Sequence, residues 1–444
     1  MRFRETAHRL SATRPSPPTS LCRSTAGWLP WIAGFSRAFV RDAIARHLRR
    51  PGVVLDPFAG VGTTLVEALL AGHEAIGFEI NPYAAFACRT KLNAHRVDPA
   101  ALREEIAQLA SFYQRSASPG FTPKSAPPKD FKTRVRFYSP KVLQKVLTIQ
   151  DYVDAMADGQ LRDIFRLAFA STMVRYSNYS YEPSLGTRVG AGKEEIDDFP
   201  VLKTIVDKLL EMAEDIAWLQ ASLPKHDPQS RVINDSCLRC ESYCAPESVD
   251  LLITSPPYLN NYHYNRNTRP QMYWLGLARE AKTFHQLEET NFGKFWQTVR
   301  QRPRIELSFK LPGSDIAETI ESLRALHAER GIYGGHGWAN YAASYFNDCY
   351  LFTKKVEYVL KPGGTALVVI GNSILQGVPI PTDRHFAEIA ASHGLEVVEI
   401  HVPRATRVGN SIVQSDVRVA KPQKPHQLYE AIVELRKKRS TPYP

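Results

Sequence analysis

The sequence predicts an α/β fold: a doubly wound, mostly parallel sheet interrupted by a helical insertion and by a second insertion rich in basic and aromatic residues. First, an apolar run at 53–55 leads into the glycine-rich stretch DPFAGVGTT (56–64) and then into a helical pattern, the order of a βαβ unit. Second, another apolar run, LLIT (251–254), ends in SPPY (255–258). Third, long segments separate the regular patterns, so the sheet is expected to be assembled from distant parts of the chain.

Composition narrows the class of protein. The 444 residues exceed one average domain, and a hydrophobic content of 43% supports a core. The sequence has no apolar run long enough for a membrane span and no apolar signal segment near its start, so a cytoplasmic, nucleoid-associated protein is expected. The formal net charge of +11 favours a polyanionic partner, because each phosphate contact releases counterions.

The first elements of the core are predicted in residues 27–98. Residues 1–26 are rich in Arg, Ser, Thr and Pro and are expected to form a flexible basic tail. Ser36 is a suitable N-cap, and apolar residues recur after it at helical spacing as far as Leu48. A strand at 53–55, the glycine-rich turn, a helix at Thr63–Ala71 and a strand at Glu74–Pro82 then complete the βαβ unit.

The glycine-rich turn predicts a nucleoside-bearing cofactor. Gly60 and Gly62 allow backbone N–H groups to approach a ligand closely. Glu79 ends the next strand, where doubly wound folds place a carboxylate that accepts hydrogen bonds from ribose hydroxyls. The NAD fingerprint GxGxxG is not met, which disfavours a nicotinamide cofactor.

The remaining segments alternate between core and insertion. A mostly helical insertion is expected at 99–230, and the sheet resumes at 231–258, where Asp235 ends a short strand. A second insertion is expected at 259–340, and the core is completed by 341–444. In this last part the pattern predicts a helix at Tyr345–Leu360, the turn KPGG, a strand from Thr365, a helix at about Asp383–His393 and a strand at Leu395–Val402.

Three cysteines, Cys237, Cys240 and Cys244, are clustered with a C-x2-C spacing that also occurs in zinc sites. A closed zinc site needs four ligands, and no second pair of Cys or His follows at a matching spacing. A loop between two strands is therefore favoured, and no metal is predicted.

The two motifs resemble those of the DNA amino-methyltransferases, which use S-adenosylmethionine (AdoMet) to methylate N4 of cytosine or N6 of adenine. The resemblance covers about 28–92 and 232–402 and leaves both insertions unmatched. It implies a Rossmann-like AdoMet methyltransferase sheet, double-stranded DNA as substrate and a cognate restriction endonuclease that acts separately. It also implies a cofactor site made of Asp56, Pro57, Phe58, Gly60, Gly62, Thr63, Glu79, Asn81 and Asp235.

The SPPY motif is expected to hold the methyl acceptor. The Ser255 hydroxyl and a carbonyl fixed by Pro256 and Pro257 would orient a planar exocyclic amine, while Tyr258 stacks on its base. In the family, the residue before PPY is often Ser in N4-cytosine enzymes and usually Asp or Asn in adenine enzymes, so Ser255 favours cytosine N4. Methylation of cytosine C5 is disfavoured because no Pro-Cys dipeptide supplies the nucleophilic thiol.

Several alternatives stay open at this point. Adenine N6 is the first, followed by N2 of guanine in RNA, whose enzymes usually carry D-PPY and an N-terminal RNA-binding domain. Protein glutamine methylation, associated with NPPY, is a further alternative. A catalytically inactive AdoMet-fold module that binds nucleic acid is the alternative of a different class, and an assay of methyl transfer would distinguish it.

The start of the second insertion has the composition of a nucleic-acid-binding surface, because Lys and Arg alternate there with aromatic residues. Target recognition is expected there or in the first insertion. Among further candidates, Trp28, Trp31 and Phe35 occupy the place of the family's AdoMet-covering segment, and Asn260, Asn261 and Asn372 follow strand ends near the pocket. Phosphate contacts are expected from Arg266, Arg269, Arg300, Arg302 and Arg304.

Overall fold

The computed structural model describes most of the chain. It covers residues 28–29, 36–118, 120–181, 184–224, 226, 228–260, 262, 264–406 and 428–439. The expected basic tail at 1–26, together with Trp31, Phe35 and Asn261, lies outside the described residues.

The centre of the fold is a seven-stranded sheet with the order β10-β11-β7-β6-β1-β2-β5. Strands β5, β2, β1, β6 and β7 are parallel, and β11 pairs antiparallel with both β7 and β10. The chain moves outward from β1 in one direction and from β6 in the other, so the predicted doubly wound sheet is confirmed. The strands are β1 (Val53–Asp56), β2 (Glu74–Phe78), β5 (Ser230–Ile233), β6 (Val249–Thr254), β7 (Leu360–Gly371), β10 (Leu395–Thr406) and β11 (Leu428–Lys437).

Helices cover both faces of this sheet because its central strands are apolar on both sides. Val54 and Leu251 face one core, whereas their neighbours Leu55 and Leu252 face the other, as the alternation of side chains in a strand requires. Helices α1 (Arg37–His47) and α2 (Thr63–Leu70) pack on the first face, and α12 (Gly335–Val359) and α13 (Thr382–Ser392) pack on the second.

Local sequence explains where the core helices begin. The Ser36 hydroxyl accepts a hydrogen bond from the Phe39 N–H and caps α1, as predicted. Gly62 precedes α2 with a φ of 87°, a conformation that favours glycine. Asn81 caps α3 (Pro82–Asn93) by accepting hydrogen bonds from the backbone N–H groups of Tyr83 and Ala84.

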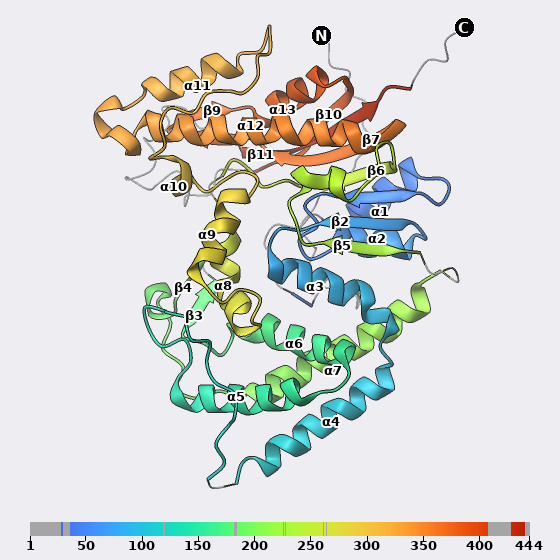
Figure 1. Cartoon of the computed structure of the whole chain (residues 1–444), viewed down its shortest axis with the longest axis vertical. Helices are drawn as coiled ribbons and strands as arrows, with labels where there is room; N and C mark the ends of the chain where they lie inside the picture. The colour runs from blue at the N-terminus through green and yellow to red at the C-terminus, as the bar shows by residue number, and fades with distance from the viewer. Residues whose placement is uncertain are drawn as a thin grey trace.

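A separate helical lobe carries its own hydrophobic core, and Figure 1 shows it below the sheet. The lobe contains most of the first insertion but also α8 of the second, since Met272 and Trp274 belong to its core. Trp28 is buried in the same core and donates a hydrogen bond to Asp215. The elements are η2 (Ala94–Arg96), α4 (Pro99–Arg115), α5 (Pro140–Ala155), α6 (Gly159–Thr172), β3 (Tyr179–Tyr181), β4 (Leu185–Thr187), η3 (Val189–Ala191), α7 (Val201–Ser222), α8 (Tyr264–Trp274) and α9 (Ala281–Thr290).

The rest of the second insertion packs on the sheet side of the molecule, mainly against α12. Trp296 stacks on Trp338 of α12 with ring centroids 4.8 Å apart. The second insertion is therefore divided between the two cores. The remaining elements are η4 (Cys237–Ser242), α10 (Trp296–Val299), α11 (Ile316–Ala325), η5 (Ala328–Tyr333), β8 (Ser373–Leu375) and β9 (Val378–Ile380).

Two sequence predictions about the core strands need correction. KPGG was expected to separate a helix from a strand, but it lies inside β7, where residues 361–364 form a bulge between the pairs of β7 with Val249 and Leu251. Asp235 was expected to end a strand, whereas β5 already ends at Ile233. Strand β11 was not predicted at all, because its sequence LYEAIVELRK is rich in good helix formers.

Candidate active site

A hydrogen bond joins the two sequence motifs at the carboxyl ends of β1 and β6. The Thr254 hydroxyl donates to the Asp56 carboxylate over 2.6 Å, and the Phe58 N–H donates to the same oxygen over 3.0 Å. Asp56 is 2% exposed, and this burial raises its pKa to about 6 against the opposing effect of the Thr254 hydrogen bond. Strand order reverses between β1 and β6, which is where doubly wound sheets bind their ligands.

Glu79 holds the glycine-rich turn against the end of β2. Its carboxylate accepts one hydrogen bond from the Gly60 N–H over 2.8 Å and another from the Asn81 N–H over 2.7 Å. Burial raises the pKa of Glu79 to about 7, despite these two hydrogen bonds and with a further contribution from the charge of Asp56. The carboxylate therefore lies next to the turn, with part of the residue open to the cavity described below.

Gly62 is needed for packing within the turn. A Cβ atom at this position would lie 2.5 Å from Sγ of Cys88 in α3, and the φ of 87° would strain any other residue. Gly62 does not itself line the described cavity, whereas Gly60 does.

Asp235 lies two residues beyond the carboxyl end of β5, the outermost strand of the sheet next to β2. It accepts hydrogen bonds from the Tyr243 hydroxyl over 2.6 Å and from the Ser236 N–H over 2.7 Å, and it pairs with Arg239. Burial alone would raise the pKa of Asp235, but these hydrogen bonds and the Arg239 charge hold the pKa below its usual value. Asp235 is thus an ionised, pre-oriented acceptor.

Ser255 and Tyr258 form a short polar chain that leads from the acceptor motif towards the surface. The Ser255 hydroxyl donates to the Tyr258 hydroxyl over 3.5 Å, and the latter donates to Glu430 of β11 over 3.2 Å. The Tyr258 ring lies against Gly371, where an added Cβ would approach the ring to 3.0 Å. Tyr258 is therefore held by the end of β7 and by β11.

One cavity contains most of the predicted cofactor and acceptor residues. Its described walls bring together the ends of β1, β2, β5 and β6 and a segment of the second insertion. Gly62, Pro256 and Tyr258 are not among its wall residues. The predicted residues that line it are Asp56, Pro57, Phe58, Gly60, Thr63, Glu79, Asn81, Asp235, Ser255 and Pro257.

The second insertion closes the opposite side of this cavity. Phe292 packs edge-on against Phe58 with ring centroids 5.1 Å apart, and a Cβ on Gly293 would lie 3.6 Å from Pro257. Both motifs are therefore covered by residues that follow α9. No sequence motif marked this segment, because its contacts depend on tertiary packing.

Two asparagines of the second insertion, one in α8 and one just after α9, were missed by the sequence analysis. Asn265 is 1% exposed, and its side-chain Nδ2 has no hydrogen-bond partner among the described residues. The same holds for the buried side-chain oxygen of Asn291. Both residues line the cavity, so its walls hold one buried donor and one buried acceptor that lack partners among the described residues. In the sequence, nothing separates them from turn-forming asparagines.

The arginines predicted to contact phosphates already have partners within the chain. Arg300 lies over the rings of Trp296 and Tyr333, at 4.6 and 4.8 Å from their centroids. Arg302 pairs with Glu289, and Arg304 pairs with Glu306 and Glu321. A phosphate contact from Arg302 or Arg304 would therefore compete with an existing ion pair.

The other two arginines contact the helical lobe. Arg269 donates to the Lys132 carbonyl over 3.0 Å and lies over the rings of Phe131 and Tyr273, and Arg266 is 3.5 Å from the Leu185 carbonyl.

The remaining candidate residues are buried, bonded to the backbone, or exposed away from the cavity. Cys237, Cys240 and Cys244 are buried, and burial raises the pKa of each thiol. Asn372 accepts a hydrogen bond from the Tyr429 N–H, which joins β11 to the end of β7, and Asn260 is exposed.

In the described part of the chain, no group of three or more His, Cys, Asp or Glu residues is arranged to hold a metal ion. Within the same residues, no helix has the length and apolarity needed to cross a membrane.

Comparisons with known proteins agree with the motifs. A family model for N6/N4 methyltransferases, described as DNA methylase, matches residues 26–87. The chain is 24% identical to the Type II methyltransferase M.BsoBI of Geobacillus stearothermophilus, over 88% of this chain and 82% of that protein. It is 22% identical to the Type II methyltransferase M.MvaI of Kocuria varians, over 75% of this chain and 73% of that protein. It is 23% identical to the Type II methyltransferase M.AvaI of Anabaena variabilis, over 87% of this chain and 82% of that protein. These similarities support DNA amino-methylation as the reaction.

Proposed function

We propose that this chain, whose motifs and relatives are those of the N4/N6 DNA amino-methyltransferases, transfers the methyl group of AdoMet to N4 of cytosine in duplex DNA. The observation that carries the choice of cytosine is Ser255, a neutral hydroxyl at the position before PPY and in the wall of the same cavity as the Gly60 turn. An exocyclic amine needs hydrogen-bond acceptors to orient it, and Ser255 supplies one without a negative charge.

The cavity fits AdoMet by its donor and acceptor groups. Glu79 would accept hydrogen bonds from the ribose hydroxyls, and Asp235 would accept one from the adenine amino group. The unused Nδ2 of Asn265 and the unused oxygen of Asn291 offer partners for the charged methionine end. A sulfonium methyl group is already activated, so the remaining task of the protein is to hold donor and acceptor in line.

The acceptor nitrogen must lose a proton when the methyl group is transferred. We assign the route of this proton to the hydrogen-bonded chain from Ser255 through Tyr258 to the exposed carboxylate of Glu430. N4 would pass its proton to the Ser255 oxygen, the Ser255 proton would pass to Tyr258, and the Tyr258 proton would pass to Glu430. Each hydroxyl gives up one proton and receives one, so the relay restores itself once Glu430 releases its proton to water.

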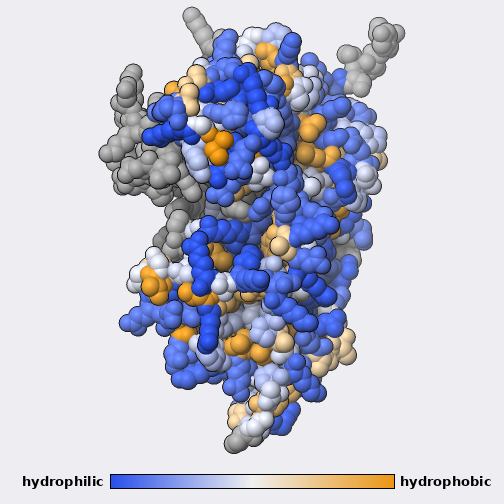
Figure 2. All heavy atoms as spheres, turned by 60° about the vertical axis from the view of Figure 1, so that its left-hand side comes forward, coloured by the Kyte–Doolittle hydropathy of each residue, from blue (hydrophilic) through white to orange (hydrophobic). Residues whose placement is uncertain are grey.

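The outer surface suits a charged partner. Figure 2 shows one face of the molecule as mainly hydrophilic, with hydrophobic residues in small separate groups. Such isolated apolar residues do not mark an apolar docking site. With a net charge of +11, the chain is suited to DNA in the cytoplasm, and the Type II relatives favour a cognate restriction endonuclease that acts separately.

The identity of the product tests this proposal. Purified protein, AdoMet with a labelled methyl group and duplex DNA would be incubated, and the DNA digested to nucleosides for mass spectrometry. N4-methylcytosine is the expected product. N6-methyladenine alone would overturn the role given to Ser255 and keep the enzyme class, whereas methylated RNA alone would overturn both. Label in neither nucleic acid, with AdoMet still bound, would favour an inactive binding module.

A further inference from the structure

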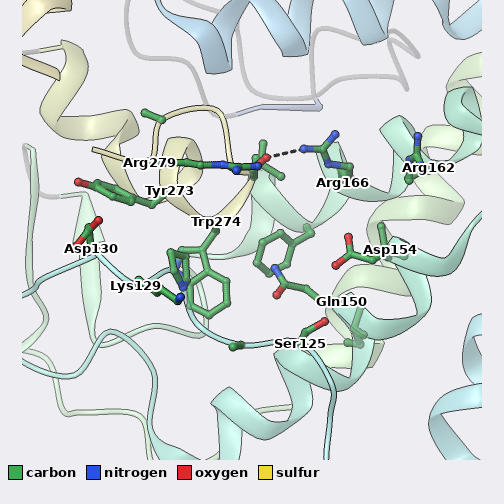
Figure 3. Close-up of a pocket in the computed structure, with 18 residues that line it drawn as sticks. Ser125, Lys129, Asp130, Gln150, Asp154, Arg162, Arg166, Tyr273, Trp274 and Arg279 are labelled. Carbon is green, nitrogen blue, oxygen red and sulfur yellow. Dashed lines mark hydrogen bonds between the residues drawn. The ribbon is translucent and has the colours of Figure 1, made fainter. Parts of the chain in front are cut away.

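A second cavity lies in the helical lobe, and Figure 3 shows the residues that line it. Its volume is about 620 Å³. Its walls come from the loop at 125–130, from α5 and α6, and from the turn that follows α8. The proposed reaction makes no use of this cavity.

Positive charge predominates in its walls. Lys129, Arg162, Arg166 and Arg279 line it, together with two carboxylates, those of Asp130 and Asp154. In Figure 3, Arg279 and Arg166 extend towards each other along one edge of the cavity, from the α8–α9 turn and from α6.

One of the two arginines on α6, Arg166, is fixed in place. Arg166 donates to the Leu275 carbonyl over 2.6 Å and lies over the Phe86 ring. Arg279 and Lys129, in contrast, form no ion pair with any residue in the part of the chain that the structure describes. Two cations at one cavity without their own counterions favour an anionic ligand.

Trp274 adds a buried, unused donor at the same place. Its side chain is 8% exposed, and its Nε1–H has no hydrogen-bond partner among the described residues. The ring is held by Tyr138 and Phe169, with centroids 5.1 and 6.1 Å away. An unpaired buried donor is costly, so such a group calls for an acceptor from a ligand. Arginine, lysine and an indole N–H are all donors, and together they suit the oxygens of a phosphate.

We propose that this cavity binds a backbone phosphate of the substrate DNA, beside the nucleotides that flank the target base. The inference rests on the proposed function, because it takes duplex DNA as the substrate. It assigns DNA contact to the helical lobe, and it gives α8 a role at both of its ends.

The length of α8 supports this assignment. Asn265 near its start lines the active-site cavity, and Trp274 at its end lines the second cavity. An α-helix rises about 1.5 Å per residue, so these two positions are separated by about 14 Å along the helix. Duplex DNA rises about 3.4 Å per base pair, so this length corresponds to about four base-pair steps. When the target base is turned out into the active-site cavity, a backbone phosphate about four base pairs away is therefore within reach of the second cavity.

Two variants test the phosphate contact. Arg279→Gln removes a cation that has no partner among the described residues, and Trp274→Phe removes the N–H while keeping an aromatic ring. Lys203→Gln on α7 is the matched control, because it also removes one exposed charge from the helical lobe. DNA affinity would be measured by fluorescence anisotropy over a range of salt concentrations, and AdoMet affinity by calorimetry.

We expect Arg279→Gln to reduce the slope of log affinity against log salt by about one unit. Trp274→Phe should weaken DNA binding by about two- to tenfold with little change in slope, since it removes one neutral donor. Neither variant should change AdoMet affinity, and Lys203→Gln should leave DNA binding as it is. DNA affinity and salt slope equal to the wild type in Arg279→Gln would overturn the proposal, even if Trp274→Phe failed to fold.

A chemical probe locates the contact on the DNA. Duplexes would carry a single neutral methylphosphonate, placed in turn at each position near the target. Wild-type protein should bind less tightly when the substitution falls about four nucleotides from the target, and Arg279→Gln should be indifferent to it there. Equal sensitivity of both proteins at every position would refute the contact while leaving methyl transfer intact. An absence of methyl transfer to any DNA by the wild type would instead overturn the proposed function.

Discussion

Asn265 accepts a hydrogen bond from the Asn81 side chain over 3.3 Å, and so the second insertion is tied to the start of α3. Asn81 in turn donates its backbone N–H to Glu79, whose other oxygen holds Gly60. A continuous chain of hydrogen bonds therefore runs from the glycine-rich turn to a helix outside the sheet. Cofactor affinity is expected to depend on residues that no AdoMet motif includes.

The first prediction concerns Asn265. Asn265→Leu removes the unused Nδ2 donor and also the oxygen that accepts from Asn81, and it should weaken AdoMet binding by about tenfold or more, since each lost hydrogen bond accounts for about two- to tenfold. Asn260→Leu is the control, because Asn260 is exposed and does not line the cavity. Calorimetric titration with AdoMet and with methylthioadenosine, which lacks the amino-acid end, would show which part of the cofactor is contacted. Equal affinities for AdoMet in the wild type and in Asn265→Leu would contradict the assignment.

The second prediction concerns pH. Burial raises the pKa of Glu79 to about 7 in the protein without AdoMet. Ribose hydroxyls bind best to the ionised carboxylate, so AdoMet binding below pH 7 should release a proton from Glu79. Affinity should rise by up to about tenfold per pH unit as the pH approaches 7, and then level off. Titrations from about pH 5.5 to 8.5 in buffers of different ionisation enthalpy measure both effects. Glu79→Gln should bind weakly and with a much flatter pH profile.

The same raised pKa has a consequence for folding. Because the folded state holds this proton more tightly than the unfolded chain, Glu79 favours folding below its unfolded pKa, and that contribution is lost as the pH rises towards 7. Bound AdoMet should remove this trend, since it favours the ionised form, which the unfolded chain also adopts in this pH range. Thermal unfolding of the free protein and the complex at several pH values would reveal the difference.

The third prediction concerns the link between the motifs. Thr254→Val removes the hydroxyl that donates to buried Asp56 and should destabilise the fold by about 1–3 kcal/mol, whereas Thr254→Ser should be close to the wild type. Urea unfolding measures the change. A Thr254→Val protein as stable as the wild type would show that Asp56 finds another donor.

The fourth prediction concerns the proton route. Glu430→Gln and Tyr258→Phe should each slow methyl transfer while AdoMet affinity stays near normal, because neither residue lines the described cavity. The effect should fall short of the roughly 100-fold typical of losing a direct general base, since water can replace an exposed carboxylate. Glu396→Gln on β10 is a matched exposed control. Single-turnover rates that are unchanged in both variants would exclude this route.

Local sequence was sufficient for the βαβ unit and for the gathering of the candidate residues at one edge of the sheet. Ser36 caps α1 and Asn81 caps α3 through side chains that act within a few residues, so their patterns are visible in sequence. Asp56 ends one parallel strand, and Glu79, Asp235 and Ser255 follow three others, so their positions meet at one edge of the sheet.

What the sequence did not predict depends on contacts between distant residues. Strand β11 consists largely of good helix formers, yet Ile432 and Val433 face opposite cores between β7 and β10, so tertiary packing decides its structure. The unused groups of Asn265 and Trp274 become visible after packing has removed them from water. Likewise, the ion pairs Arg302–Glu289 and Arg304–Glu321 join positions that no short-range pattern connects.

The position of β11 ties the acceptor motif to a strand that is distant from it in sequence. This strand fills the gap between β7 and β10 and carries Glu430 beside Tyr258. If β11 detached, the edge of β7 would lose its hydrogen-bonding partner and become open to pairing with other chains. A shortened polypeptide without residues 428–437 would therefore keep the glycine-rich turn and the SPPY motif but would be prone to aggregation.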